Sequence, residues 1–235
     1  MLLEICVNSL QSALAARQGG ARRIELCQDL ASGGITPSAG LIRYCVQHLE
    51  METRVLIRPR SGNFTYSSQE LEVIAADIKM CRDLGAAAVV IGFLNSEGDI
   101  DVPLTKEMVK LALPMEVTFH RAFDACRHPQ EALEQLIDCG CHKLLTSGCA
   151  PTAMEGASLI RQLMQQAQGR IGIIAASGIT PDNVRQVVEA TGVNEVHGSC
   201  KRVGTCEDGG TELFPFTETV TDASQVAEMV RILNG

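Results

Sequence analysis

Two cysteines near the amino terminus have the residue type and spacing of a metal-binding pair. Cys6 and Cys27 each follow a glutamate by two residues, and both stand in short apolar runs. If these runs form neighbouring strands, about 5 Å apart, the two sulfur atoms can reach one ion. Soft thiolates select Cu(I). Packing is the alternative interpretation, because an unpaired cysteine is commonly buried as a small hydrophobic side chain.

A second group of residues has the types needed for acid–base catalysis on a small molecule. His120, Arg121 and Asp124 follow one apolar run, and His197 lies in another. Imidazole and carboxylate groups transfer protons, whereas a guanidinium binds an anionic substrate. Together with Glu25 these residues are candidate catalytic groups. The alternative is that each is a structural group satisfied by its neighbours.

Two further segments are candidates for binding an anion. Arg58 and Arg60 flank a proline, and two guanidinium groups can clamp a carboxylate or a phosphate. Ser177 and Gly178 precede a Thr-Pro pair at 180–181, and a second Thr-Pro pair stands at 36–37; each predicts a helix with Thr as N-cap and Pro at the first position. The N–H groups at such a helix start favour an anion. The alternative is a well-capped helix with no ligand.

These residues are positioned by eight short apolar runs that alternate with amphipathic stretches. The expected strands are Leu2–Asn8, Arg23–Cys27, Arg54–Arg58, Ala87–Phe93, Glu116–Ala122, Lys143–Gly148, Ile171–Ser177 and Glu195–Ser199. The stretches with apolar residues at every third or fourth position, which is the helical period, include Ser9–Gln18, Gln69–Leu84, Pro129–Cys139, Ala153–Gln168 and Pro181–Thr191. A glycine precedes four of the strands, at 20, 85, 140 and 192, where a left-handed residue would end the helix.

Strict alternation of strands and helices predicts an α/β protein with a parallel sheet. Eight such units within 235 residues favour a closed (β/α)8 barrel of the TIM type. An open doubly wound sheet is the alternative, but no GxGxxG fingerprint follows an early strand. We therefore expect one barrel domain over residues 1–235, with a long connection at 201–222 before a final helix. Its site is expected at the carboxyl ends of the strands.

Alternation within each strand places charged side chains inside the barrel, since the outer side must meet helices. The charged residues expected at the lumen are Glu4, Glu25, Glu195, Arg58, Arg60 and Arg121. We expect the glutamates to pair with these arginines, because an unpaired buried charge costs several kcal/mol. A structural ion-pair network is one interpretation of such a lumen, and an anion or metal site is the other.

Composition excludes several classes of function. The formal net charge of −8 argues against binding to nucleic acid or to anionic membranes. No apolar stretch reaches 18 residues and no secretory signal is present, so a cytoplasmic protein is expected. The 10 cysteines show no zinc spacing; the nearest pairs are Cys139 with Cys141 and Cys200 with Cys206. Free thiols are therefore expected.

Several segments of the sequence closely resemble the CutC family. The matching segments are Leu3–Cys6, Arg23–Cys27, Gly33–Ser38, Ile57–Arg60, Thr118–Asp124, Leu145–Gly148 and Ser177–Ile179. The resemblance implies a cytoplasmic (β/α)8 barrel, often found as a homo-oligomer, with a role in copper homeostasis. In that family, the cysteines that match Cys6 and Cys27 are those proposed to bind copper.

The expected function is accordingly Cu(I) binding through these two thiolates. An alternative is an enzyme that acts on a small anionic or phosphorylated metabolite at the barrel mouth. A third possibility is a scaffold with a purely structural lumen.

Overall fold

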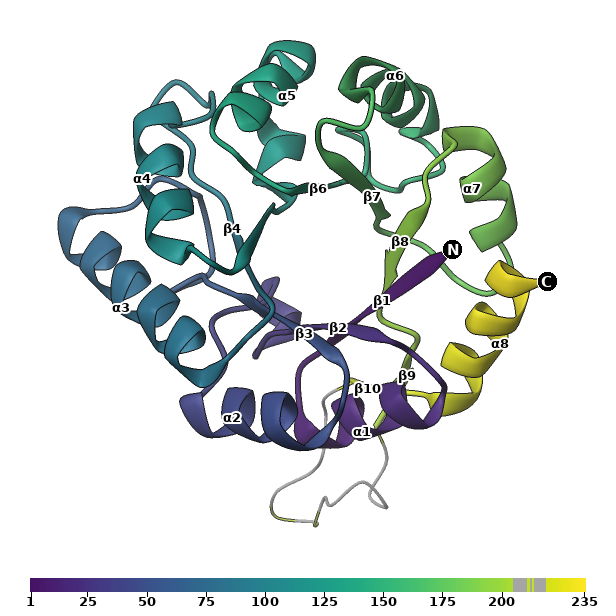
Figure 1. Ribbon diagram of the computed structural model, residues 1–235. Helices are drawn as coiled ribbons and strands as arrows, with labels where there is room; N and C mark the ends of the chain where they lie inside the picture. Colours follow the sequence, from purple (N-terminus) through teal and green to yellow (C-terminus); the bar gives the residue numbers. More distant parts are fainter. Residues whose placement is uncertain (205–210, 212, 214–218) are drawn as a thin grey trace.

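Eight parallel strands close into a barrel in the order of the sequence, and helices surround it (Figure 1). The computed structural model describes residues 1–204, 211, 213 and 219–235. The barrel strands are β1 (Leu2–Val7), β2 (Arg23–Leu26), β3 (Glu52–Leu56), β4 (Ala88–Ile91), β5 (Glu116–Phe119), β6 (Lys143–Thr146), β7 (Gly172–Ala176) and β8 (Glu195–Gly198). The expected (β/α)8 barrel is confirmed.

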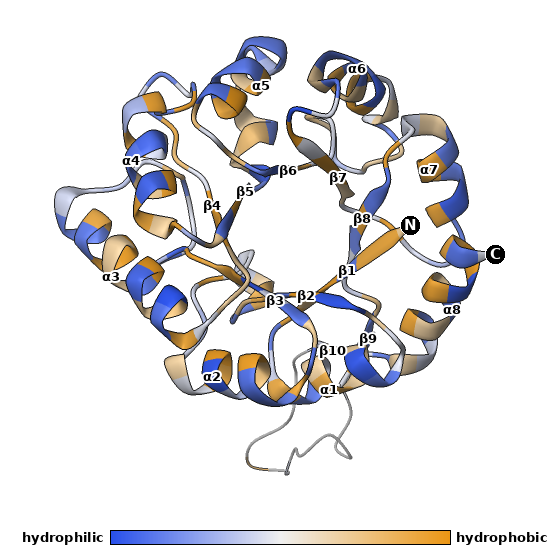
Figure 2. Cartoon of the chain, in the orientation of Figure 1, coloured by the Kyte–Doolittle hydropathy of each residue, from blue (hydrophilic) through white to orange (hydrophobic). Residues whose placement is uncertain are grey.

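The helices lie outside the strands, with their apolar faces turned toward them (Figure 2). They are α1 (Leu10–Gln18), α2 (Ala39–His48), α3 (Ser68–Leu84), α4 (Val102–Ala112), α5 (Pro129–Asp138), α6 (Ala157–Ala167), α7 (Val184–Thr191) and α8 (Ala223–Asn234), with short 3-10 helices η1 (Leu30–Ser32) and η2 (Arg121–Ala125). In α5, Ala132, Leu133 and Leu136 are the buried positions, spaced as one helical face requires. This packing makes the main core the layer between strands and helices.

The four glycines that precede strands have left-handed backbone, as expected. Gly20, Gly85, Gly140 and Gly192 have φ values of 86°, 83°, 83° and 78°. A residue with a side chain is strained in this conformation, so glycine is suited to the turn from helix to strand.

The two expected Thr-Pro helix starts are wrong. Helix α2 begins at Ala39, where the Ser38 hydroxyl accepts the N–H of Leu41, because the hydroxyl at position 36 accepts the N–H of Arg58 instead, at 2.9 Å. Helix α7 begins at Val184, three residues after the Pro of the second pair. A turn held by the side chain of Asn183 occupies the intervening positions.

The connection after β8 contains secondary structure. β9 (Lys201–Val203) and β10 (Thr219–Thr221) form an antiparallel pair before α8. Residues 205–210, 212 and 214–218, and with them Cys206, lie outside the described part of the chain. No helix in the part that is described combines the length and apolar character needed to cross a bilayer.

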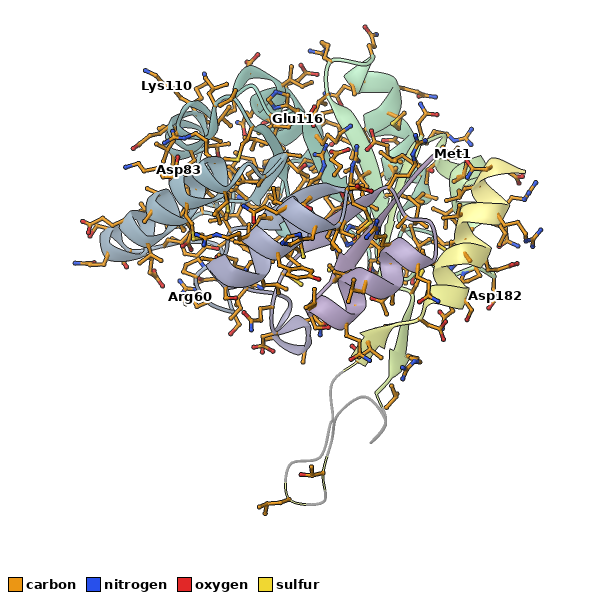
Figure 3. The ribbon with its side chains drawn as sticks, turned by 60° about the horizontal axis from the view of Figure 1, so that its bottom comes forward. Met1, Arg60, Asp83, Lys110, Glu116 and Asp182 are labelled. Atoms are coloured by element: carbon orange, nitrogen blue, oxygen red, sulfur yellow. The ribbon has the colours of Figure 1, made fainter. Side chains whose placement is uncertain are left out.

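The two ends of the barrel are visible in Figure 3. Met1 and Glu116, at the starts of strands, lie toward the top of that view, whereas Arg60 and Asp182, which follow strands, lie toward the bottom. The candidate site belongs to the second of these ends.

Candidate functional site

The two predicted thiol ligands lie side by side on adjacent strands. β1 pairs with β2 in a register that places Cys6 opposite Glu25. The Sγ atoms of Cys6 and Cys27 are 3.7 Å apart, and the Cys6 Sγ is 3.8 Å from the Glu25 Oε1. Both cysteines are buried and free. The sequence correctly predicted that strand pairing would bring these sulfurs together.

Cys6 also belongs to a cluster of three different donor types. One ligand atom each from Cys6, Glu25 and His197 lies within 4.8 Å of the others. The Oε2 of Glu25 is buried and has no hydrogen-bond partner in the described part of the chain. Since an unpartnered buried carboxyl oxygen is costly, its position beside the Cys6 sulfur and the His197 ring fits a bound cation. Glu25 and His197, which we expected as acid–base groups, thus lie beside the thiols.

His197 is oriented by a carboxylate beneath the cluster. Its Nδ1 is 2.8 Å from the Oε1 of Glu4, which leaves Nε2 as the nitrogen available to a ligand. Burial lowers the pKa of His197, but the Glu25 and Glu4 carboxylates outweigh it, so the pKa is raised overall. Burial raises the pKa of Glu4, but His197, Arg54 and Arg23 hold it below its usual value. The two groups thus favour the charged pair.

The other members of the cluster are held toward their neutral forms. Burial, with the charge of Glu4, raises the pKa of Glu25. The hydrogen bond with Cys27, followed by burial, raises the pKa of Cys6 well above its usual value. A cation that binds these groups must displace their protons.

A layer of ion pairs fills the barrel below the thiols. Arg54 is 1% exposed; its Nε lies 2.8 Å from Glu52 Oε1, its Nη2 lies 2.7 Å from Glu116 Oε2 and its Nη1 donates to the Thr118 hydroxyl at 2.9 Å. Its Nε is also 3.6 Å from Glu4 Oε2. Arg54 thus contacts carboxylates on its own strand and on two others, β1 and β5.

The expected partners of the inward glutamates are wrong. Glu195 pairs with Arg23 and Lys143, and Glu4 pairs with Arg23, Arg54 and His197. Arg58, Arg60 and Arg121 lie beyond the carboxyl ends of strands, too high in the barrel to reach these acids. The signal for Arg54 was present in the sequence, because it precedes Arg58 by an even number of residues in the same expected strand and so faces the same side.

The upper lumen is less polar than expected. Leu56 and Val90 pack with the two cysteines, and Leu145 and Ile174 form a second apolar group with Ala176. The charged layer therefore lies under an apolar collar, and the two thiols are part of that collar.

His120 faces a small pocket at the mouth of the barrel. The pocket has a volume of about 250 Å³, and its walls include Cys6, Glu25, Leu30, Leu56, Arg58, Phe64, His120, Arg121, Leu145 and His197. The Nδ1 of His120 accepts the N–H of Ala122 at 3.1 Å. Burial, together with the charge of Arg58, lowers the pKa of His120 to about 3. The imidazole is therefore neutral near pH 7, with its one hydrogen on Nε2.

Arg121 and Asp124 form an ion pair at the same mouth. The Arg121 Nε is 2.8 Å from the Asp124 Oδ2. Asp124 also accepts hydrogen bonds from the Thr146 hydroxyl and from the N–H groups of Ser147 and Cys149. Because its oxygens are already satisfied, Asp124 anchors the turn after β6. The Arg121 side chain remains 43% exposed and lines the pocket.

The two arginines predicted as anion clamps differ in their surroundings. The Arg58 guanidinium donates to the carbonyl oxygens of Gly33, Gly34 and Gly62 at 3.1, 3.0 and 2.8 Å, so it ties two loops together at the pocket wall. Arg60 pairs with Glu70 and is not among the residues that line the pocket. Of these two arginines, Arg58 is the one that lines the pocket with His120.

Ser177 and Gly178 line a second, larger pocket of about 540 Å³ that shares Cys6, Arg121 and His197 with the first. The Ser177 hydroxyl donates to the Pro151 carbonyl at 2.8 Å. Because α7 starts only at Val184, the expected helix start does not adjoin this turn.

A closed parallel barrel with thiol, carboxylate and imidazole donors at the carboxyl ends of its strands defines a (β/α)8 protein with a candidate soft-metal site. The model of the CutC family matches residues 1–202. The chain belongs to the CutC family.

Individual relatives agree with this assignment. A CutC family protein from Glaesserella parasuis is 48% identical over 201 residues, covering 86% of this chain and 83% of the relative. The copper homeostasis protein cutC homolog of Mus musculus is 46% identical over 200 residues, covering 85% and 74%. The crystal structure of a CutC protein from Streptococcus agalactiae superposes with a TM-score of 0.81 at 31% identity, covering 85% of this chain and 98% of that one.

Proposed function

We propose that this protein binds Cu(I) through Cys6 and Cys27 as part of copper homeostasis. The observation that carries the proposal is the 3.7 Å separation of the two sulfurs on adjacent strands. Thiolates are soft ligands that select Cu(I) over harder ions. The copper homeostasis name of the mouse relative supports the same ion.

Glu25 and His197 would complete the environment of the ion. Both offer a donor atom within 4.8 Å of the Cys6 sulfur, and His197 is held by Glu4 in the carboxylate–histidine arrangement that orients metal ligands. When bound, the ion would take the place of the thiol protons of this buried cluster. The apolar collar of Leu56 and Val90 would keep water from the thiolates.

An anaerobic Cu(I) titration against a chromophoric chelator tests the proposal. Cys6→Ser and Cys27→Ser are each expected to weaken Cu(I) binding by more than about 100-fold, since loss of a direct ligand exceeds the effect of losing an outer-shell partner. Cys149→Ser is the matched control, because Cys149 is a free but exposed cysteine; its affinity should equal that of the parent. Circular dichroism checks that each variant is folded.

The result that would contradict the proposal is equal affinity in the parent and in both buried-cysteine variants. Loss of binding in the Cys149 variant would also contradict it, since copper would then be held at the surface.

A further inference from the structure

The pocket that His120 faces contains hydrogen-bonding groups that the copper proposal leaves unused. His120 is 6% exposed and its Nε2 has no hydrogen-bond partner among residues 1–204, 211, 213 and 219–235. Because Nδ1 accepts the N–H of Ala122, the hydrogen of the neutral ring is on Nε2. His120 is therefore a fixed donor that is buried and unsatisfied. Such a group is costly unless something else accepts its hydrogen.

A second unsatisfied donor lines the same pocket. The Nε of Arg58 is buried, and it too is without a partner in the described part of the chain. Among the described residues, the terminal nitrogens of Arg58 donate to backbone carbonyls, and no carboxylate lies within salt-bridge distance of it. Burial raises the pKa of the nearby Tyr66 hydroxyl, and the Arg58 guanidinium acts against this rise. The Phe64 ring packs against both groups, 5.0 Å from the His120 ring and 5.1 Å from the Arg58 Cζ. Burial lowers the pKa of His120, and the positive charge of Arg58 is close enough to help lower it.

We propose that this pocket binds a small organic carboxylate, whose oxygens accept hydrogen bonds from His120 Nε2 and Arg58 Nε. A carboxylate offers two acceptor oxygens and one negative charge, which suits two donors and one positive charge without a counter-ion. Leu30, Leu56, Phe64 and Leu145 supply an apolar wall for the carbon chain.

The size and charge of the pocket restrict the ligand further. Its volume of about 250 Å³ is below the roughly 300–1,000 Å³ that is typical of pockets for drug-sized ligands, so the ligand is a small molecule. Arg121 and His197 of the same lining are already paired with Asp124 and Glu4. Arg58 therefore supplies the one uncompensated positive charge among the described lining residues, and a second negative charge on the ligand would be buried without a partner. A monocarboxylate is therefore favoured over a phosphate dianion.

Gly92 gives the His120 ring its position. A Cβ built on Gly92 would lie 2.2 Å from the ring Cε1 and 2.4 Å from Nδ1. Position 92, directly after β4, must therefore be glycine if the His120 ring is to occupy this site. The place of the His120 Nε2 donor thus depends on the residue at position 92 as well as on His120 itself.

The test uses the metal-free protein labelled with 15N-histidine, with propionate and inorganic phosphate as probes at pH 7. In the unmodified protein, added propionate is expected to shift the His120 Nε2 resonance until the shift reaches a plateau. In His120→Asn, where the shorter side chain keeps an acceptor for the Ala122 N–H, propionate affinity followed by backbone amide shifts should fall about 10-fold or more. His48→Gln, at an exposed histidine of α2, is the control and should bind as the parent does.

Three outcomes would overturn the proposal. One is the absence of any His120 shift up to 50 mM propionate, about the limit of weak binding. Another is equal propionate affinity in the parent and in His120→Asn. The last is tighter binding of phosphate than of propionate at the same residues, which would show that the pocket is a phosphate site and not a carboxylate site. Because no copper is present, failure of the Cu(I) proposal leaves each outcome unchanged.

Discussion

Acid stability offers a quantitative check on the burial of His120. In the folded protein the pKa of His120 is about 3, compared with the ordinary value of 6.5 for an exposed histidine. As the pH falls from 7 to 5, the unfolded chain takes up most of one proton at this residue while the folded protein takes up almost none. The unfolded state is thereby favoured, and linkage gives a loss of about 2 kcal/mol of unfolding free energy over these two pH units. The whole window lies above the folded pKa, so the loss depends little on its value.

The substitution His120→Asn isolates the contribution of His120 to the loss of unfolding free energy at low pH. The variant has no titrating group at this position, so it should lose about 2 kcal/mol less than the parent between pH 7 and pH 5. Urea unfolding at the two pH values gives the four free energies, and the contributions of all other groups cancel in the difference. His48→Gln is the control, and its pH dependence should match that of the parent. Identical pH dependence in the parent and in His120→Asn would refute the reasoning.

Two further substitutions test the interior of the barrel by urea unfolding. Arg54→Met leaves Glu4 buried with fewer partners and is expected to destabilise the protein by about 3–5 kcal/mol; a loss below about 1 kcal/mol would show that the layer is not structural. Gly92→Ala places a methyl group against the His120 ring and is expected to cost about 1–3 kcal/mol, whereas Gly40→Ala adds the same group in open space and should cause no loss; equal effects of the two would contradict the packing.

The fold was predictable because each unit repeats the same local signal. Short apolar runs, helical periodicity and glycines at positive φ recur around the barrel, and each is a property of neighbouring residues. The starts of α2 and α7 were not predictable in the same way. Thr36 is a good N-cap by residue type, but its hydroxyl accepts the N–H of Arg58, 22 positions away. A competing long-range hydrogen bond cannot be read from local preference.

The candidate site was also predictable only in part, because some of its contacts follow from strand pairing and others depend on the closed barrel. Strand alternation brought Cys6 and Cys27 together, since both lie on the inner face of adjacent strands. The place of His197 depends on closure of the barrel, because only the pairing of β8 with β1 sets it opposite Glu4. The partners of the arginines depend on the level of each residue along the barrel axis. The alternation of residues in a strand predicts which side a residue faces, but not which residues of other strands lie at the same level. Arg58 and Arg54 share a face, yet one binds loop carbonyls and the other binds carboxylates.

The charged layer beneath the thiols closes the barrel at the amino ends of its strands, so access to the thiols is from the carboxyl ends. Glu4, Arg23 and Arg54 are each 5% exposed or less, and moving an ion through this layer would require several ion pairs to separate at once. An ion bound at Cys6 would therefore arrive and leave at the carboxyl end of the barrel, past Arg121, which lines both pockets there. A substitution of Arg121 should change the rates of ion entry and exit together, with little effect on their ratio. The mouth would then control the residence time of the ion, and the thiols would control its affinity.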